Sequence, residues 1–214
     1  MTQPIMLVTG GSRGIGAATA LIAAARGWRV ALTYQSNAAA ADEVVNKIRA
    51  AGGTAIALQA DVGVEADVLR VFKAVDEQLG TLSVLVNNAG MLEQQTRLDQ
   101  MELDRWQRVF SANVFGTFLC AKQAVLRMST KYGGKGGNIV NVSSAAARLG
   151  SPNEFIDYAS AKGAVDSMTL GLSKEVAAEG IRVNAIRPGL IYTDIHTLAG
   201  EPGRVDRAKA GVPM

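Results

Sequence analysis

The stretch Thr9-Gly10-Gly11-Ser12-Arg13-Gly14-Ile15-Gly16 decides the fold of this chain. It follows a short apolar run over 5–8 and precedes an alanine-rich segment over 17–26 that is typical of a helix. A strand, a glycine turn and a helix are the context of a dinucleotide-binding loop, because glycines let the backbone approach a pyrophosphate and the helix start offers N–H donors. The spacing differs from the common G-x-G-x-x-G, and no G-K-S/T follows, which excludes a mononucleotide P-loop. A plain glycine turn is the alternative interpretation.

The second predicted strand, over 29–33, bears on the choice of dinucleotide. It leads into Tyr34-Gln35-Ser36-Asn37, which contains no acidic residue. An Asp or Glu at this point would bind a ribose 2′-hydroxyl and repel a 2′-phosphate. Its absence permits the phosphate, and Arg13 could supply the countercharge. We therefore expect NADP(H) to be favoured, with NAD(H) as the alternative; a merely solvated Arg13 is the competing interpretation.

Strand and helix patterns alternate along the rest of the chain. Further strands are predicted over 54–59, 82–86, 138–142 and 181–186, and helices over 38–51, 65–79, 101–131 and 157–178, the first of them capped by Asn37. This alternation predicts one α/β domain over 1–214, a Rossmann-type doubly wound parallel sheet with right-handed crossovers. The remainder after the sixth strand is polar and contains Pro202, Gly203 and Pro213.

Three polar features interrupt these elements and suggest chemistry. Tyr158 and Lys162 are four residues apart, so on a helix they share one face, and the cation would favour the phenolate and lower the tyrosine pKa. Alone, this pair is a weak signal, because the same spacing occurs on many solvated helices. Asn113 lies within the longest helical pattern, where asparagine is a poor helix former, and Ser144 follows the fifth strand.

Composition excludes several classes of protein. The 214 residues carry a net charge of +3 without a basic run, so nucleic acid is not an expected partner. One Cys and one His make a disulfide or a metal site improbable, and no metal is expected. The N-terminus lacks the layout of a signal peptide, and no apolar run appears long enough to cross a membrane. We expect a cytoplasmic protein without a membrane partner.

Taken together, the motifs resemble the short-chain dehydrogenase/reductase family. They occur in the family's order and cover essentially the whole chain: Thr9-Gly10-x-x-x-Gly14-x-Gly16, Asn87-Asn88-Ala89-Gly90, Asn113, Ser143-Ser144, Tyr158-x-x-x-Lys162 and Pro188-Gly189. The chain is most similar in kind to bacterial glucose 1-dehydrogenase-like and 3-oxoacyl-carrier-protein-reductase-like members. The resemblance implies hydride transfer between a nicotinamide cofactor and a small carbonyl or secondary-alcohol substrate.

The resemblance also assigns roles to individual residues. Tyr158 would be the general acid/base, Lys162 would lower its pKa and hold the nicotinamide ribose, Ser144 would bind the substrate oxygen, and Asn113 would support a proton-relaying water. The remaining expected cofactor-binding residues are Gly10, Ser12, Arg13, Ile15, Gly16, Ser36, Asn37, Asp61, Val62, Asn88, Ala89, Gly90, Pro188, Gly189, Ile191 and Thr193. A homodimer or homotetramer is implied as well.

Three departures from the family pattern stand out. The spacing from Ser144 to Tyr158 is one residue longer than usual, Gln35 stands where NADP-preferring relatives often have a basic residue, and the family's final helix and strand are lacking. A catalytically silent cofactor-binding sensor or scaffold is the rival interpretation, although such a protein should have lost part of the set Asn113, Ser144, Tyr158 and Lys162.

Overall fold

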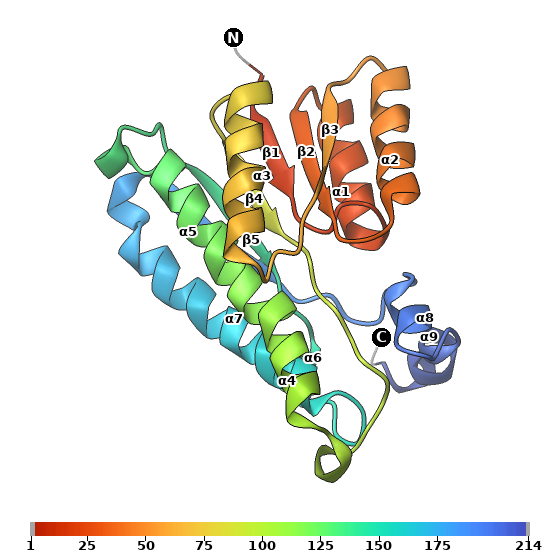
Figure 1. The fold of residues 1–214 in the computed structure, drawn as a ribbon. Coiled ribbons are helices and arrows are strands. Elements are labelled where there is room, and N and C mark those ends of the chain that lie inside the picture. The colour runs from red at the N-terminus through yellow and green to blue at the C-terminus, as the bar shows by residue number, and fades with distance from the viewer. Residues whose placement is uncertain (1–2, 213–214) are drawn as a thin grey trace.

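A computed structural model describes residues 3–212 and shows a twisted sheet with helices on both faces (Figure 1). Neighbouring strands are parallel throughout, in the order β3-β2-β1-β4-β5-β6. The strands are β1 (Ile5–Val8), β2 (Arg29–Tyr34), β3 (Ala55–Gln59), β4 (Val84–Asn87), β5 (Gly137–Val142) and β6 (Ile181–Ile186). This order confirms the predicted Rossmann-type doubly wound sheet.

The helices occupy the segments between these strands. They are α1 (Gly14–Ala25), α2 (Ala38–Ala50), α3 (Glu65–Gln78), α4 (Leu103–Phe110), α5 (Gly116–Met128), α6 (Ala146–Leu149), α7 (Ile156–Glu175), α8 (Ile195–Leu198) and α9 (Arg204–Ala208). The Asn37 side chain accepts a hydrogen bond from Ala40 N, which confirms it as the cap of α2. Short 3₁₀ turns cover 98–100, 130–132, 177–179 and 209–211.

Two hydrophobic layers hold the sheet between its helices. On one face α1 and α2 pack on β1, β2 and β3 through residues such as Val30, Leu32 and Ile48. On the other face α3, α5 and α7 pack through a larger cluster that includes Phe72, Leu85 and Ile139 (Figure 1). Strands covered on both faces, such as β2 and β4, are buried without strict alternation, whereas β6 alternates buried Ile181 and Val183 with exposed Arg182 and Asn184.

The strand order places the carboxyl ends of β1 and β4 side by side. From β1 the chain proceeds toward β2 and β3 in one direction, and toward β4, β5 and β6 in the other. Ligands of open α/β sheets bind in the crevice at such a switch point. Three segments follow strands at this edge of the sheet: the glycine loop (9–16) after β1, the Asn88 turn (87–90) after β4, and Ser144 after β5.

The predicted continuous helix over 101–131 is wrong in one respect. A π-helical segment, Ser111–Phe115, separates α4 from α5 and contains Asn113. The Asn113 Nδ2 atom donates to Val109 O at 2.9 Å, so the side chain competes for the backbone carbonyl four residues earlier. Asn113, a poor helix former, therefore marks the irregular turn. Segments of π-helix are frequent at functional sites.

The helical run Leu103–Met128 also corrects the expectation about apolar length. It is long enough to cross a membrane, and its most apolar window of 18 residues is apolar enough to do so. Half of its most apolar window is buried inside the fold, where α5 packs against α3 and β4. A core helix passes this test as readily as a membrane span does, so the finding is weak evidence for a membrane.

Two connections contain short helices. The polar remainder after β6 forms α8 and α9, each no longer than five residues. Between Ser144 and Tyr158, the extra residue lies in a connection that contains α6 and two non-glycine residues with positive φ, Ser151 (44°) and Asn153 (62°). Left-handed backbone of this kind accommodates the insertion within a tight turn.

A chain of buried amides crosses the core below the crevice. Asn87 Nδ2 on β4 donates to Asn141 Oδ1 on β5 at 3.0 Å, and Asn141 Nδ2 donates to Thr169 Oγ1 on α7 at 2.9 Å. Both asparagines are buried, and Asn87 Nδ2 also points at Thr117 O on α5. These bonds fix two central strands against the helix that carries Tyr158.

Asn141→Ala is expected to lower the free energy of unfolding by about 1–3 kcal/mol, because it removes one hydrogen bond each from the buried Asn87 amide and Thr169 hydroxyl and leaves a cavity between them. Urea denaturation followed by circular dichroism measures the change. Asn184→Ala, at an exposed position of β6, is the control and should change stability by less than about 0.5 kcal/mol. Equal effects of the two variants would contradict the structural importance of the amide chain.

Candidate active site

The glycine loop is packed so closely that side chains are excluded from it. A Cβ atom at Gly16 would lie 2.4 Å from Gly10 O and 2.5 Å from Asn88 Nδ2, closer than atoms can approach. Arg13, the residue before α1, makes no side-chain capping bond, so the N–H groups at the start of α1 are free to meet a ligand. Such a start, with glycine backbone in front of it, suits a phosphate group.

The Asn88 turn is tied directly to this loop. Asn88 Nδ2 donates to both Thr9 O and Gly10 O at 2.9 Å, and Thr9 Oγ1 accepts from the backbone N–H groups of Asn88 and Ala89 at 3.0 Å. The two adjacent amides have different partners: Asn87 bonds to Asn141 on β5, whereas Asn88 bonds to the loop after β1. The switch point is thereby a fixed surface.

The expected adenosine side of the site lies after β2 and β3. Gln35 Nε2 donates to Asp61 Oδ2 at 2.9 Å, while Asp61 Oδ1 accepts from Gly63 N at 2.8 Å. Val62 is buried beside Gly116, whereas Ser36 and Asn37 are exposed and Asn37 serves as the α2 cap. Arg13 is also exposed, and it makes no ion pair within residues 3–212.

Tyr158 and Ser144 are brought together from α7 and the end of β5. Burial raises the pKa of Tyr158 above its ordinary value, against smaller lowering effects from a hydrogen bond with Ser144 and from the positive charge of Arg204. Ser144 Oγ also accepts from Ala146 N at 3.1 Å, whereas Ser143 Oγ turns away and donates to Lys162 O. The expected choice of Ser144 over Ser143 agrees with these contacts.

Lys162 is the most deeply buried charge of this group. Its ammonium donates to Val142 O at 2.8 Å and lies 5.5 Å from the centre of the Tyr158 ring. Burial lowers the pKa of Lys162 to about 8, and the charge of Asp166 acts against this shift. The net shift of the Tyr158 pKa in the free protein is upward, because burial of the phenol is the largest effect on it.

Asn113 fixes the start of the loop that follows Gly90. Its Nδ2 donates to Met91 O at 3.0 Å, and its Oδ1 accepts from Met91 N at 3.3 Å. A Cβ atom at Gly90 would lie 2.7 Å from Asn113 Oδ1 and 3.4 Å from Lys162 Nζ, so only glycine fits between them. Asn113 and Lys162 therefore meet at Gly90, directly after the Asn88 turn.

The segment after β6 closes the crevice from the other side. Pro188 O accepts from Ala145 N at 2.9 Å, which links this segment to the turn after Ser144. A Cβ atom at Gly14 would lie 3.3 Å from Thr193 Cγ2, so Thr193 lies beside the glycine loop. Gly189 and Ile191 lie between these two contacts in the chain, and Ile191 O is bonded to His196 Nε2 of α8. The segment after β6 is thus tied to the turn after Ser144 and lies beside the glycine loop.

Two charged residues of this region carry no motif by which the sequence would reveal them. Arg105 on α4 and Asp157 on α7 form a buried ion pair at 2.7 Å, one residue before Tyr158. An isolated arginine on the apolar face of a predicted helix was the only available signal. Arg204 of α9 was missed as well, because that short helix was not predicted. In the part of the chain described, no group of three or more His, Cys, Asp or Glu residues is placed to hold a metal ion.

Known proteins resemble this chain in sequence. The family model described as short chain dehydrogenase matches residues 4–202. The uncharacterized oxidoreductase YgfF of Escherichia coli is 57% identical over 98% of this chain and 85% of its own length. A 3-oxoacyl-[acyl-carrier-protein] reductase of Synechocystis is 43% identical over 94% of this chain and 80% of its own.

A solved structure extends the likeness to the fold. The crystal structure of a short chain dehydrogenase from Burkholderia cenocepacia in complex with NADP superposes with a TM-score of 0.86 at 36% identity, covering 98% of this chain and 81% of that one. Family match, relatives, sheet order and crevice geometry agree. The chain therefore belongs to the short-chain dehydrogenase family of oxidoreductases.

Proposed function

We propose that the protein transfers a hydride between NADP(H) and a small carbonyl or secondary-alcohol substrate, with Tyr158 as the general acid/base. The observation that carries the proposal is the series of contacts that runs from Ser144 to Tyr158, from Tyr158 to Lys162, and from Lys162 across Gly90 to Asn113, directly after the Asn88 turn. A silent sensor or scaffold would not need this series of contacts.

Each side chain has a role that follows from its position. As the substrate carbonyl gains negative charge, the hydroxyls of Ser144 and Tyr158 donate to its oxygen, and the Tyr158 proton completes the alcohol. Lys162, held by Val142 O, offers a positive charge that favours the phenolate left behind. Asn113 fixes Met91 and thereby the wall of the site beside Lys162.

The residues of the crevice fit a nicotinamide dinucleotide. The bound cofactor would supply or accept the hydride. Gly10, Ser12, Ile15 and Gly16 would present backbone to its pyrophosphate, and Arg13 would meet a 2′-phosphate, because no acid stands after β2 and Arg13 has no partner within residues 3–212. The NADP complex of the Burkholderia relative supports this preference. Asp61 and Val62 would flank the adenine, with Ser36 and Asn37 near the phosphate.

We also propose that the protein forms a homodimer or homotetramer in the cytoplasm. Large apolar side chains are exposed along the helices that the family resemblance pairs between subunits: Leu103 on α4, Phe115 and Phe118 beside and on α5, and Leu170 on α7. An exposed apolar surface of this kind is typical of a protein–protein contact.

Tyr158→Phe is expected to lower turnover by about 10²–10⁴-fold, because the acid that protonates the alkoxide is lost. Oxidation of NADPH is followed with the aldehyde, ketone or 3-oxo ester that the wild-type protein reduces fastest in a panel of such compounds. NADPH affinity should change by less than about threefold, and Tyr132→Phe, at an exposed tyrosine, should behave as wild type. Wild-type turnover by Tyr158→Phe, or no reduction of any panel member by the wild type, would count against the proposed function.

Arg13→Ala is expected to weaken NADPH binding by about 5–20-fold while leaving NADH binding nearly unchanged, because only the 2′-phosphate loses a charge-assisted partner. Titration with each nucleotide, followed by nicotinamide fluorescence, gives both affinities. Arg26→Ala removes the same charge at the far, exposed end of α1 and should have little effect. Tighter binding of NADH than NADPH by the wild type would contradict the preference for NADP(H), but it would leave the proposed oxidoreductase activity intact.

Lys162→Met is expected to stabilise the cofactor-free protein at pH 7 by about 1–3 kcal/mol while abolishing turnover. The pKa of Lys162 is about 8 in the folded protein and 10.5 in the unfolded chain. Below pH 8 the ammonium is charged in both states, so the full free-energy cost of burying it lowers the stability of the wild type. Between pH 8 and 10.5 only the unfolded chain keeps the proton, so the wild type gains stability as pH rises. Urea titrations at several pH values should therefore show the advantage of Lys162→Met shrinking through this window. Lys174→Met, exposed on the same helix, should show no such trend.

A further inference from the structure

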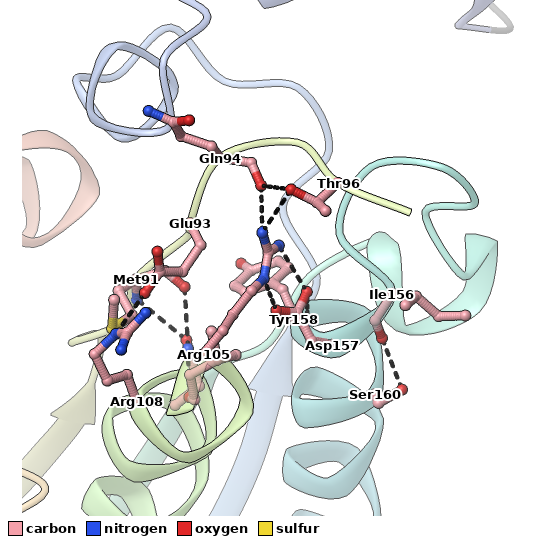
Figure 2. A network of polar contacts seen from close by, with 12 residues as sticks. Met91, Glu93, Gln94, Thr96, Arg105, Arg108, Ile156, Asp157, Tyr158 and Ser160 are labelled. Atoms are coloured by element: carbon pink, nitrogen blue, oxygen red, sulfur yellow. Dashed lines mark hydrogen bonds and ion pairs between the residues drawn. The ribbon is translucent and has the colours of Figure 1, made fainter. Parts of the chain in front are cut away.

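The ion pair between Arg105 and Asp157 is shielded from solvent. The side chains are 9% and 2% exposed, and the fork of Arg105 meets both carboxylate oxygens, Nε to Oδ2 at 2.7 Å and Nη2 to Oδ1 at 3.3 Å (Figure 2). A buried pair of this kind contributes little net stability relative to apolar side chains of the same size, because both ions lose their hydration. Its geometric consequences are therefore of greater interest than its energy.

Asp157 connects this pair to the backbone of the next residue. It lies in the first turn of α7, where a carboxylate is favoured by the helix dipole, and its Oδ1 accepts from Tyr158 N at 2.9 Å. The same oxygen thus bonds Arg105 and the backbone N–H of Tyr158. Movement of Arg105 would shift the start of α7 and, with it, the Tyr158 ring.

Arg105 uses its remaining donor group on a different segment. Its Nη1 donates to Gln94 O at 2.5 Å and to Thr96 Oγ1 at 3.0 Å, and Thr96 N in turn donates to Glu154 O just before α7 (Figure 2). These bonds fix the far end of the 91–97 loop, whose near end is fixed by Asn113 at Met91. The 91–97 loop is therefore bound to the helix of Tyr158 through one guanidinium.

A neighbouring, exposed ion pair on the same helix provides a comparison. Arg108, one turn further along α4, pairs with Glu93 of the same loop at 2.8 Å, but its side chain is largely exposed. Exposed pairs of this type contribute little, because water and salt screen them. The two arginines thus share a helix and a target loop and differ in burial and in contact with Asp157.

We propose that Arg105 and Asp157 are positioning residues that set the Tyr158 hydroxyl relative to the 91–97 loop, and so relative to a substrate carbonyl held between them. The inference rests on the proposed role of Tyr158. It extends that role, because the cofactor crevice needs neither residue: Arg105 and Asp157 make no contact with the glycine loop or the Asn88 turn among the hydrogen bonds of residues 3–212. Misplacement of reacting groups by about 1 Å is enough to lower a rate about 10²-fold.

The test compares Arg105→Gln, Asp157→Asn, the double variant and Arg108→Gln, with the carbonyl probe chosen for the wild type. The concentration of folded, competent sites is first counted by the stoichiometry of NADPH binding, and kcat is expressed per site. Arg105→Gln should lower kcat per site by about 10–100-fold with NADPH affinity within about threefold of wild type. Arg108→Gln should leave both quantities unchanged.

The double variant separates positioning from loss of structure. In Arg105→Gln a buried carboxylate is left unpaired beside Tyr158, and Asp157→Asn removes that charge while keeping an oxygen for Tyr158 N. The double variant should therefore regain part of the kcat lost by Arg105→Gln, so that the two substitutions are non-additive. Unchanged kcat per NADPH site in Arg105→Gln, or a purely additive double variant, would overturn the inference.

Tyr158→Phe, measured in parallel, distinguishes this failure from that of the proposed function. If Tyr158→Phe is inactive while Arg105→Gln turns over like the wild type per site, only the positioning role is wrong. If Tyr158→Phe retains full turnover, the proposed role of Tyr158 is wrong, and the inference falls with it.

Discussion

The burial of the Lys162 ammonium is the constraint on which the site depends. A charge without solvent needs a fixed oxygen, and Val142 O at the end of β5 supplies it at 2.8 Å. That contact requires β5 and α7 to keep their relative position, which the amide chain from Asn87 through Asn141 to Thr169 secures from below. It also requires glycine at position 90, since any side chain there would collide with Asn113 and approach Lys162. The core and the site are thus built from the same bonds.

The sheet topology explains why such distant segments meet. Parallel strands deliver their carboxyl ends to one edge, and the reversal of strand order at β1 and β4 opens a crevice there. The glycine loop follows β1, the Asn88 turn follows β4, Ser144 follows β5 and Thr193 follows β6. The helices on one face then bring Tyr158, Lys162 and Asn113 to the same edge. Functional side chains therefore come from loops and helix starts, whereas the strands mainly provide the core.

Much of this arrangement could be predicted from local sequence, and the remainder could not for physical reasons. The six strands follow from hydrophobic periodicity, and the four-residue spacing of Tyr158 and Lys162 predicts that they share one helix face. Asn113 stood out because asparagine is a poor helix former. The contact of Arg105 with Asp157 joins residues 52 apart, so only the packing of α4 on α7 reveals it. The upward shift of the Tyr158 pKa in the free protein could not be predicted from residue spacing, because spacing does not report the burial of the phenol. The short helices after β6 escaped prediction because their stability comes from contacts and not from propensity.

The most direct test of this account is the pKa of Lys162 in the cofactor-free protein. It can be measured by NMR titration of protein labelled at the lysine side chains, with the Lys162 signal assigned from its absence in a variant at that position. The account predicts a midpoint near pH 8, because the ammonium is buried against Val142 O. A midpoint near the ordinary value of 10.5 would contradict it. Lys162 would then be in water, and the contacts that join β5, Gly90 and Tyr158 around it would not describe the protein in solution.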